Sequence, residues 1–246
     1  MEPCAVVSCH VERPLDDSCW ARFTALQERT PRGFRIAALL RPPDAEAGED
    51  EERWLERARE AAARGPLGHH THFVSAEHAR PPAPGPEHAE RVRREAAWLR
   101  EHALEPRLFC GGGWYLDEPI AQALAELGYV DCTATAFRPQ YLAQGAPRLQ
   151  LAEPAWLTLE GGARLLELPA THSLGMAVRR GFDPAPLPDV VHVYFHDTDL
   201  LSARRRLALG LALRILAKRR APIDLERLAE EASNTAPEVP LKQAKG

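Results

Sequence analysis

The chain has 246 residues, of which 45% are hydrophobic and 27% charged, and its formal net charge is -4. This balance argues against electrostatic binding of nucleic acid, and no apolar run is long enough to cross a bilayer. The first residues lack the basic start and apolar stretch of a secretory signal, so we expect a cytoplasmic protein. Five cysteines without a CxxC pair predict neither a disulfide framework nor a structural zinc knuckle.

In the N-terminal half, apolar runs rich in strand-forming residues alternate with amphipathic helical patterns. Asp16, Asp17 and Ser18 form a helix-start cluster after the first run, and Pro31 ends the helix that follows. Strands are predicted over residues 5–10, 34–40 and 69–74, and a second helix over residues 51–64. A proline-rich stretch, residues 81–86, predicts a loop.

The same alternation continues in the C-terminal half, where Gly128 is a typical helix cap. Residues 130–168 are expected to form short strands. Further strands are predicted over residues 107–110 and 190–195, and helices over residues 87–102, 119–127, 200–219 and from 223 onward. We expect one domain, residues 1–233, and a flexible polar tail, residues 234–246.

Strands that alternate with helices predict parallel pairing through helical crossovers. The predicted fold is therefore α/β, a distorted barrel with mostly parallel strands. In such barrels the functional site is built at the carboxyl ends of the strands.

Polar side chains gather at those ends on three of the predicted strands. Because side chains alternate across a strand, His10 and Glu12 share one face of the first strand or its extension, and His70 and His72 share one face of the third. His196 closes the strand near the C-terminus. Imidazole and carboxylate together are ligands for a divalent cation, zinc first, with iron, cobalt or manganese as alternatives.

The remaining polar residues near these strands have simpler interpretations. His192 is expected to be a hydrogen-bonded core histidine, and Asp197 and Asp199 to cap the next helix. The histidines beside loops and helices are expected to be solvated, namely His69, His78, His88 and His102.

In three segments the chain resembles the polysaccharide deacetylase (NodB homology) family. Residues 68–73 (GHHTHF) look like its second motif, residues 109–115 (FCGGGWY) like its third, and residues 191–197 (VHVYFHD) like its fifth. The order and spacing of these segments along the chain carry the resemblance. It implies a metal-dependent deacetylase barrel, with His70 as a metal ligand and His196 as the catalytic acid.

The sequence departs from the family pattern at several positions. His10 stands where the family has its catalytic base aspartate, and Glu12 is the nearest carboxylate. The family's second metal histidine falls on Val74, so that His72 would replace it, and the arginine of the third motif falls on Cys110.

The resemblance implies hydrolysis of an acetyl group on an amino sugar or glycan precursor. Glu12, His70 and His72 would bind the metal, His10 would act as the base, and His196 as the acid. A groove formed by Gly112, Trp114 and Tyr115 would bind the sugar. A cytoplasmic substrate would be a nucleotide-linked or lipid-linked sugar, and the oligomeric state stays open.

Two other functions are compatible with the sequence. The altered base and second histidine would also suit a non-catalytic, deacetylase-like domain that binds a sugar or a partner protein. The spacing His70-Thr71-His72 is also similar to the HxH motif of amidohydrolases and phosphoesterases. In those enzymes, however, HxH usually closes the first strand, whereas here it closes the third.

Overall fold

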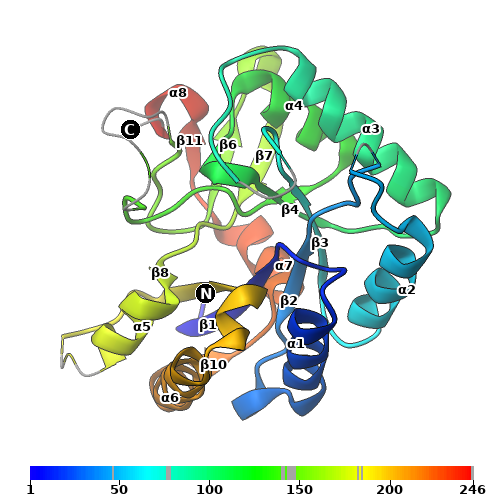
Figure 1. The fold of residues 1–246 in the computed structure, drawn as a ribbon. Helices are drawn as coiled ribbons and strands as arrows, with labels where there is room; N and C mark the ends of the chain where they lie inside the picture. The colour runs from blue at the N-terminus through cyan, green and yellow to red at the C-terminus, as the bar shows by residue number, and fades with distance from the viewer. Residues whose placement is uncertain are drawn as a thin grey trace.

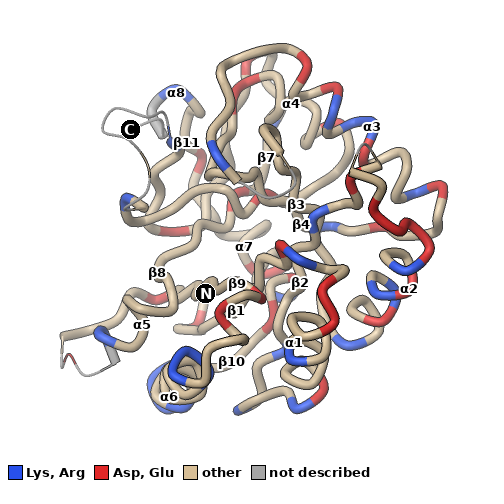
Figure 2. Tube along the Cα trace, in the orientation of Figure 1, with Lys and Arg blue, Asp and Glu red and all other residues tan. Residues whose placement is uncertain are grey.

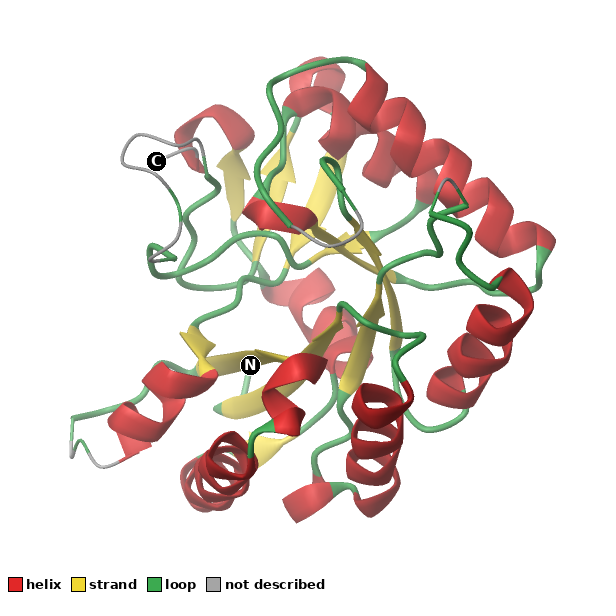
Figure 3. Cartoon of the chain, in the orientation of Figure 1, coloured by secondary structure: helices red, strands yellow, loops and turns green. Residues whose placement is uncertain are grey.

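The computed structural model describes residues 1–45, 47–75, 79–139, 142, 148–181, 183 and 185–244. Its centre is a curved, mostly parallel sheet, and helices cover the outside of this sheet (Figures 1 and 3). The first half of the chain forms β1 (Cys4–Val11), α1 (Asp17–Arg29), β2 (Ala37–Leu40), α2 (Glu51–Ala62), β3 (Leu67–Thr71), α3 (Glu87–Glu101), β4 (Leu108–Gly111), α4 (Glu118–Leu127) and β5 (Val130–Asp131).

The second half begins with a small antiparallel pair of strands and returns to the parallel sheet. Its elements are β6 (Ala155–Thr158), β7 (Arg164–Glu167), β8 (His172–Ser173), α5 (Leu174–Gly181), β9 (Val190–His196), α6 (Ala203–Arg219), β10 (Ala221–Pro222), α7 (Leu225–Thr235), β11 (Glu238–Pro240) and α8 (Leu241–Ala244). Short 3-10 turns are η1 (Pro31–Gly33), η2 (Gly112–Trp114), η3 (Glu160–Gly162) and η4 (Asp197–Leu201).

The strand order in the sheet is β11-β6-β7-β5-β4-β3-β2-β1-β9-β8, and β10 pairs with β1. Among these pairs only β6–β7 is antiparallel. The strand β9, which comes late in the sequence, therefore lies directly beside the first strand, β1. This arrangement confirms the predicted α/β fold with mostly parallel strands.

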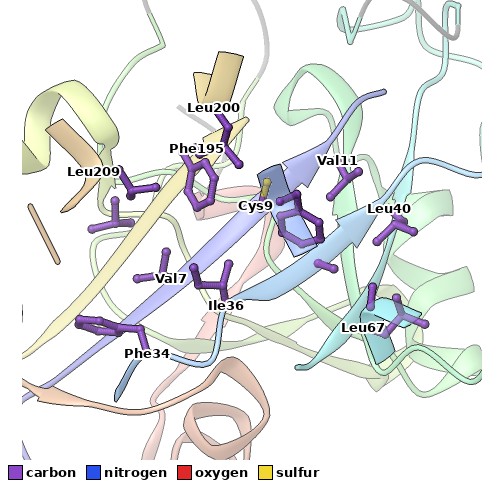
Figure 4. Packing of buried hydrophobic residues seen from close by; sticks show 14 of the residues in the cluster. Val7, Cys9, Val11, Phe34, Ile36, Leu40, Leu67, Phe195, Leu200 and Leu209 are labelled. Atoms are coloured by element: carbon purple, nitrogen blue, oxygen red, sulfur yellow. The ribbon is translucent and has the colours of Figure 1, made fainter. Parts of the chain in front are cut away.

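Side-chain alternation in β1 separates the core from the site. Val7, Cys9 and Val11 point toward the outer helices and pack with Phe195 of β9 and Leu40 of β2 (Figure 4). The intervening side chains of β1 lie on the opposite, concave face, where Val6 packs in a second cluster. His10 lies on the same concave face as Val6, because it is four residues further along β1 and side chains alternate along a strand.

Helix ends follow the capping rules that the sequence suggested. The Asp16 carboxylate accepts a hydrogen bond from the Cys19 amide (2.8 Å), and α4 ends at Gly128 with a left-handed φ of 76°. Two features differ from the sequence prediction. The helix α5 was not predicted, and residues of the expected tail form β11, which pairs with β6, followed by the buried Leu241.

No helix in the described part of the chain combines the length and the apolar character that a membrane span requires.

Candidate metal centre

The candidate site lies where β1, β3 and β9 reach their carboxyl ends. The register places His10 of β1 directly beside His196 of β9, and His70 of β3 beside Cys110 of β4. Strand alternation gives each histidine the concave face, so the three strands bring their imidazoles together. Glu12 follows the last residue of β1 and extends the same face.

Glu12 is the centre of the cluster. Its Oε2 lies 2.7 Å from Nε2 of His72, and its Oε1 lies 3.4 Å from Nε2 of His70 and 3.7 Å from Nε2 of His196. The rings of His70 and His72 meet edge-on with centroids 4.8 Å apart. The structure therefore brings together all four of these predicted residues.

The Nδ1 atoms of His70 and His72 each contact a backbone carbonyl oxygen. Nδ1 of His70 donates to the Cys110 oxygen (2.8 Å), and Nδ1 of His72 lies 3.2 Å from the Ser75 oxygen. In a neutral imidazole this leaves a lone pair on Nε2. Nε2 of His70 is buried and has no hydrogen-bond partner among the described residues.

Both Nε2 atoms face the Glu12 carboxylate, to which each donates when it carries a proton. Burial alone would raise the pKa of Glu12, but the imidazoles of His70 and His72 outweigh burial and hold that pKa well below its usual range. Burial lowers the pKa of His72, so its imidazole favours the neutral form. When both histidines are neutral, the same two Nε2 atoms and the carboxylate can bind a cation instead, and Glu12, His70 and His72 fit a divalent metal.

His10 lies deeper than the other histidines. Its ring centroid is 4.7 Å from that of His70, and its Nε2 is 3.8 Å from Sγ of Cys110. Burial, and then the neighbouring His70 and His196, hold the pKa of His10 well below its ordinary value. His10 is therefore neutral at physiological pH. It also belongs to two further sets of potential ligands, one with His70 and Cys110 and one with Glu12 and His196.

His196 forms the solvent side of the cluster, with 35% of its side chain exposed. Its backbone amide donates to Oδ2 of Asp199 (3.1 Å), and Asp197 accepts hydrogen bonds from the amides of Arg13 and Thr198. Asp199 thus closes the capping box of the 3-10 turn η4, whereas the long helix α6, which Asp197 and Asp199 were expected to cap, is capped by Ser202.

No protein-family model and no curated protein matches this sequence. The fold, in contrast, is found in solved structures. A family 4 carbohydrate esterase from Streptomyces lividans, solved in complex with acetate, matches with a TM-score of 0.50, 11% identity and 88% of each chain covered. A CE4 family pseudoenzyme from Bacillus anthracis matches with a TM-score of 0.56 and 8% identity, over 97% of this chain and 67% of that chain.

The chain has the fold of a family 4 carbohydrate esterase. A 4-alpha-glucanotransferase from Thermococcus litoralis is also similar, with a TM-score of 0.55 and 13% identity over 97% of this chain. This chain spans only 39% of the glucanotransferase.

Within this esterase fold, the three residues predicted to bind a sugar lie in different surroundings. The ring of Trp114 packs against the rings of His10 and Tyr194, with centroid distances of 5.2 Å and 4.8 Å, and Trp114 adopts a left-handed φ of 59°. Tyr115 instead donates to Asp117 and packs on Phe73, in a hydrophobic cluster that does not include the candidate metal ligands.

Gly112 lies against β3. A Cβ at Gly112 would lie 2.6 Å from the Thr71 oxygen and 3.2 Å from Cα of His72. A glycine is therefore needed for the turn after β4 to approach His72 so closely.

The histidines expected to be solvated include two that are buried. His69 contacts Glu95 (2.8 Å), and His88 contacts the carbonyl oxygen of Ala83 (2.7 Å). That expectation was wrong for both, because α3 and the loop before it cover them. His78 lies outside the described residues. His192 is the predicted core histidine, since it hydrogen-bonds Ser8 (2.8 Å).

Two aromatic residues beside the cluster were not predicted as part of the site. Phe137 stacks in parallel on Tyr194, with ring centroids 6.0 Å apart. The period-2 pattern of β9 could have indicated Tyr194, which shares a face with His196. Phe137 lies in an irregular segment, for which periodicity gives no signal.

Proposed function

We propose that the protein is a metal-dependent hydrolase that removes an acetyl group from an amino sugar or a cytoplasmic glycan precursor. The observation that carries this proposal is the convergence of the Glu12 carboxylate with Nε2 of His70 and Nε2 of His72. The esterase fold supports a carbohydrate substrate. We propose zinc as the cation, with iron, cobalt or manganese as alternatives.

Glu12, His70 and His72 would hold the cation. When bound there, it would polarise the acyl oxygen and lower the pKa of water from about 15.7 toward 7. The carbonyl oxygens of Cys110 and Ser75 fix the ring orientation of the two histidines, so that both Nε2 atoms stay directed at Glu12.

The other two histidines would move protons. His10 is neutral because burial lowers its pKa, so its lone pair is available to accept a proton from water. His196 lies at the exposed side, where its Nε2 would donate to the departing amine. The rings of Trp114, Tyr194 and Phe137 would form the apolar wall against which a sugar ring packs.

A second function is favoured by one specific observation. His10 replaces the family's carboxylate base, and its side chain is buried among His70, Trp114 and Tyr194. A base so enclosed would also suit a non-catalytic domain that binds sugar or a partner protein. Such a domain is expected to carry no stoichiometric metal after purification.

The test is an assay of acetate release from N-acetylated amino sugars by the purified chain, with and without added zinc, cobalt or manganese. We expect metal-dependent release that His70→Ala abolishes. His102→Ala is the matched control, because His102 lies at the end of α3, where its side chain contacts the carbonyl oxygen and the ring of Trp98 and none of the proposed ligands. Absence of metal-dependent release, or equal activity in the two variants, would refute the proposal.

A further inference from the structure

A cavity of about 540 Å³ opens directly beside the metal cluster. His196, Tyr194 and Phe137 line one end of it, next to Glu12. The first turn of α5 and the start of α6 complete its lining. A ligand that contacts His196 therefore extends into this cavity.

Arginine side chains from three separate segments line the cavity. Arg138 follows Phe137, Arg179 belongs to α5, and Arg205 belongs to α6. The helices α5 and α6 pack against each other, and basic segments appear on both (Figure 2). Asp199 is the one acidic residue among those that line the described part of the cavity. The lining thus carries an excess of positive charge, although the net charge of the whole chain is -4.

Arg205 is held close to His196, and Arg179 lies along its own helix. Arg205 pairs with Oδ1 of Asp199, whose other oxygen accepts the backbone amide of His196. Arg205 is therefore tied, through a single carboxylate, to the backbone of His196. Nη1 of Arg179 lies 3.7 Å from the position of a Cβ at Gly175, so its side chain folds back over the first turn of α5.

We propose that this cavity binds a phosphate group attached to the sugar whose acetyl group is removed. The proposal rests on the proposed function, and it narrows the substrate class from an amino sugar or glycan precursor to an acylated sugar phosphate. Guanidinium groups suit this ligand because their planar donors form paired hydrogen bonds with phosphate oxygens. The sugar ring would pack on Phe137 and Tyr194, between the phosphate and the metal cluster.

The test measures binding by calorimetry to chelator-treated protein, so that phosphate cannot bind through a metal and catalysis plays no part. N-acetylglucosamine 1-phosphate is compared with neutral N-acetylglucosamine and with glucuronic acid. We expect the phosphate to bind at least about tenfold more tightly than either, which is the range of one charged hydrogen bond. Equal binding of the phosphorylated and neutral sugars, or no binding of either, would overturn the proposal.

Two matched variants locate the binding site. Arg179→Gln is expected to weaken binding of the sugar phosphate about tenfold, whereas Arg22→Gln, which removes an equally exposed arginine of α1 on another face, is expected to change nothing. Equal effects would mean non-specific attraction and would contradict the proposal. Tighter binding of glucuronic acid would assign the cavity to a carboxylate instead.

If the holoenzyme deacetylates both sugars, Arg179→Gln is expected to raise KM for the sugar phosphate, whereas Arg22→Gln is expected to leave the kinetics of both sugars unchanged. An enzyme that is active but does not distinguish the two sugars would refute the phosphate site and leave the proposed function standing.

Discussion

The strand β3 carries a histidine–glutamate cluster on each of its two faces, and the two clusters differ in their hydrogen bonding. On the concave face, Nε2 of His70 and Nε2 of His72 face the carboxylate of Glu12, and the three residues form a set of potential metal ligands. On the outer face, His69 and Glu95 are joined by further donors.

In that outer cluster every acceptor meets a donor. Glu95 Oε2 accepts from Thr71 Oγ1 (2.7 Å) and His69 Nε2 (2.8 Å), while Oε1 accepts from Arg91 Nε (2.7 Å). The hydroxyl oxygen of Tyr129 lies 3.3 Å from Nδ1 of His69. We therefore expect that burial and residue type alone do not make a metal site. On the outer face hydrogen-bond donors satisfy the carboxylate, whereas the concave face brings potential ligands together.

Loss of a ligand on the concave face should have the largest effect. Loss of a residue that only supports a metal ligand costs up to about 100-fold in activity. His70→Ala removes one of the three proposed ligands itself, so we expect loss of bound metal and a larger fall in activity. Mass spectrometry of the metal content and the acetate assay measure this. His69→Ala should lower stability but keep the metal, and metal loss in that variant would break the comparison.

The outer face should determine stability in acid. Burial alone would raise the pKa of Glu95, but His69 and Arg91 lower it to about 2, from an ordinary value of 4.5. The charged carboxylate therefore stabilises the fold above pH 4.5, by on the order of 3 kcal/mol, and this contribution disappears as the pH falls toward 2.

Glu95→Gln is accordingly expected to be less stable than the native chain at pH 7, with the difference shrinking toward pH 2. Urea unfolding of chelator-treated protein across this pH range measures it. Glu101→Gln, at the exposed end of α3, is the control and should follow the native curve. A difference for Glu95→Gln that does not change with pH would show that the carboxylate is not charged in the fold.

Metal should stabilise the native chain through the concave face alone. A cation that binds only the folded state at 100 times its Kd adds about 2.7 kcal/mol to the unfolding free energy. We expect the melting temperature to rise on addition of zinc and to return after chelation. The rise should be absent in His70→Ala and present in Glu95→Gln. The reverse pattern would assign the metal to the outer face, at His69 and Glu95.

The smallest effect is expected at Gly112. Gly112→Ala would force a Cβ against Thr71 and His72, so we expect about 1 kcal/mol of destabilisation together with weaker metal binding. Gly210→Ala, within α6 and with no atom within 4 Å of its Cβ position, should instead stabilise the chain slightly. If both variants behave alike in metal titrations, the close approach of Gly112 to His72 does not matter for the site.

Sequence periodicity predicted which residues share a face, but not what faces them. The alternation in β1, β3 and β9 placed His10, His70 and His196 on the concave side, as the structure shows. The same alternation placed His69 on the outer side, where it was expected to be solvated. Nothing in the sequence around His69 indicates that Glu95, 26 residues later, lies over it, because that contact depends on how α3 packs.

Two other features depend on tertiary structure. The adjacency of β1 and β9, which pairs His10 with His196, brings together strands that are far apart in the sequence, and sequence patterns do not specify this strand order. The cavity beside His196 combines α5, which was not predicted, with Phe137 from an irregular segment. Short helices and loops lack the periodic signal from which the longer elements were predicted.

The most direct test of the metal centre is a crystal of the full chain soaked with zinc and measured at the zinc absorption edge. Our interpretation predicts one anomalous peak within bonding distance of Nε2 of His70, Nε2 of His72 and the Glu12 carboxylate. A peak at His69 and Glu95, or no peak at the concave face, would contradict it.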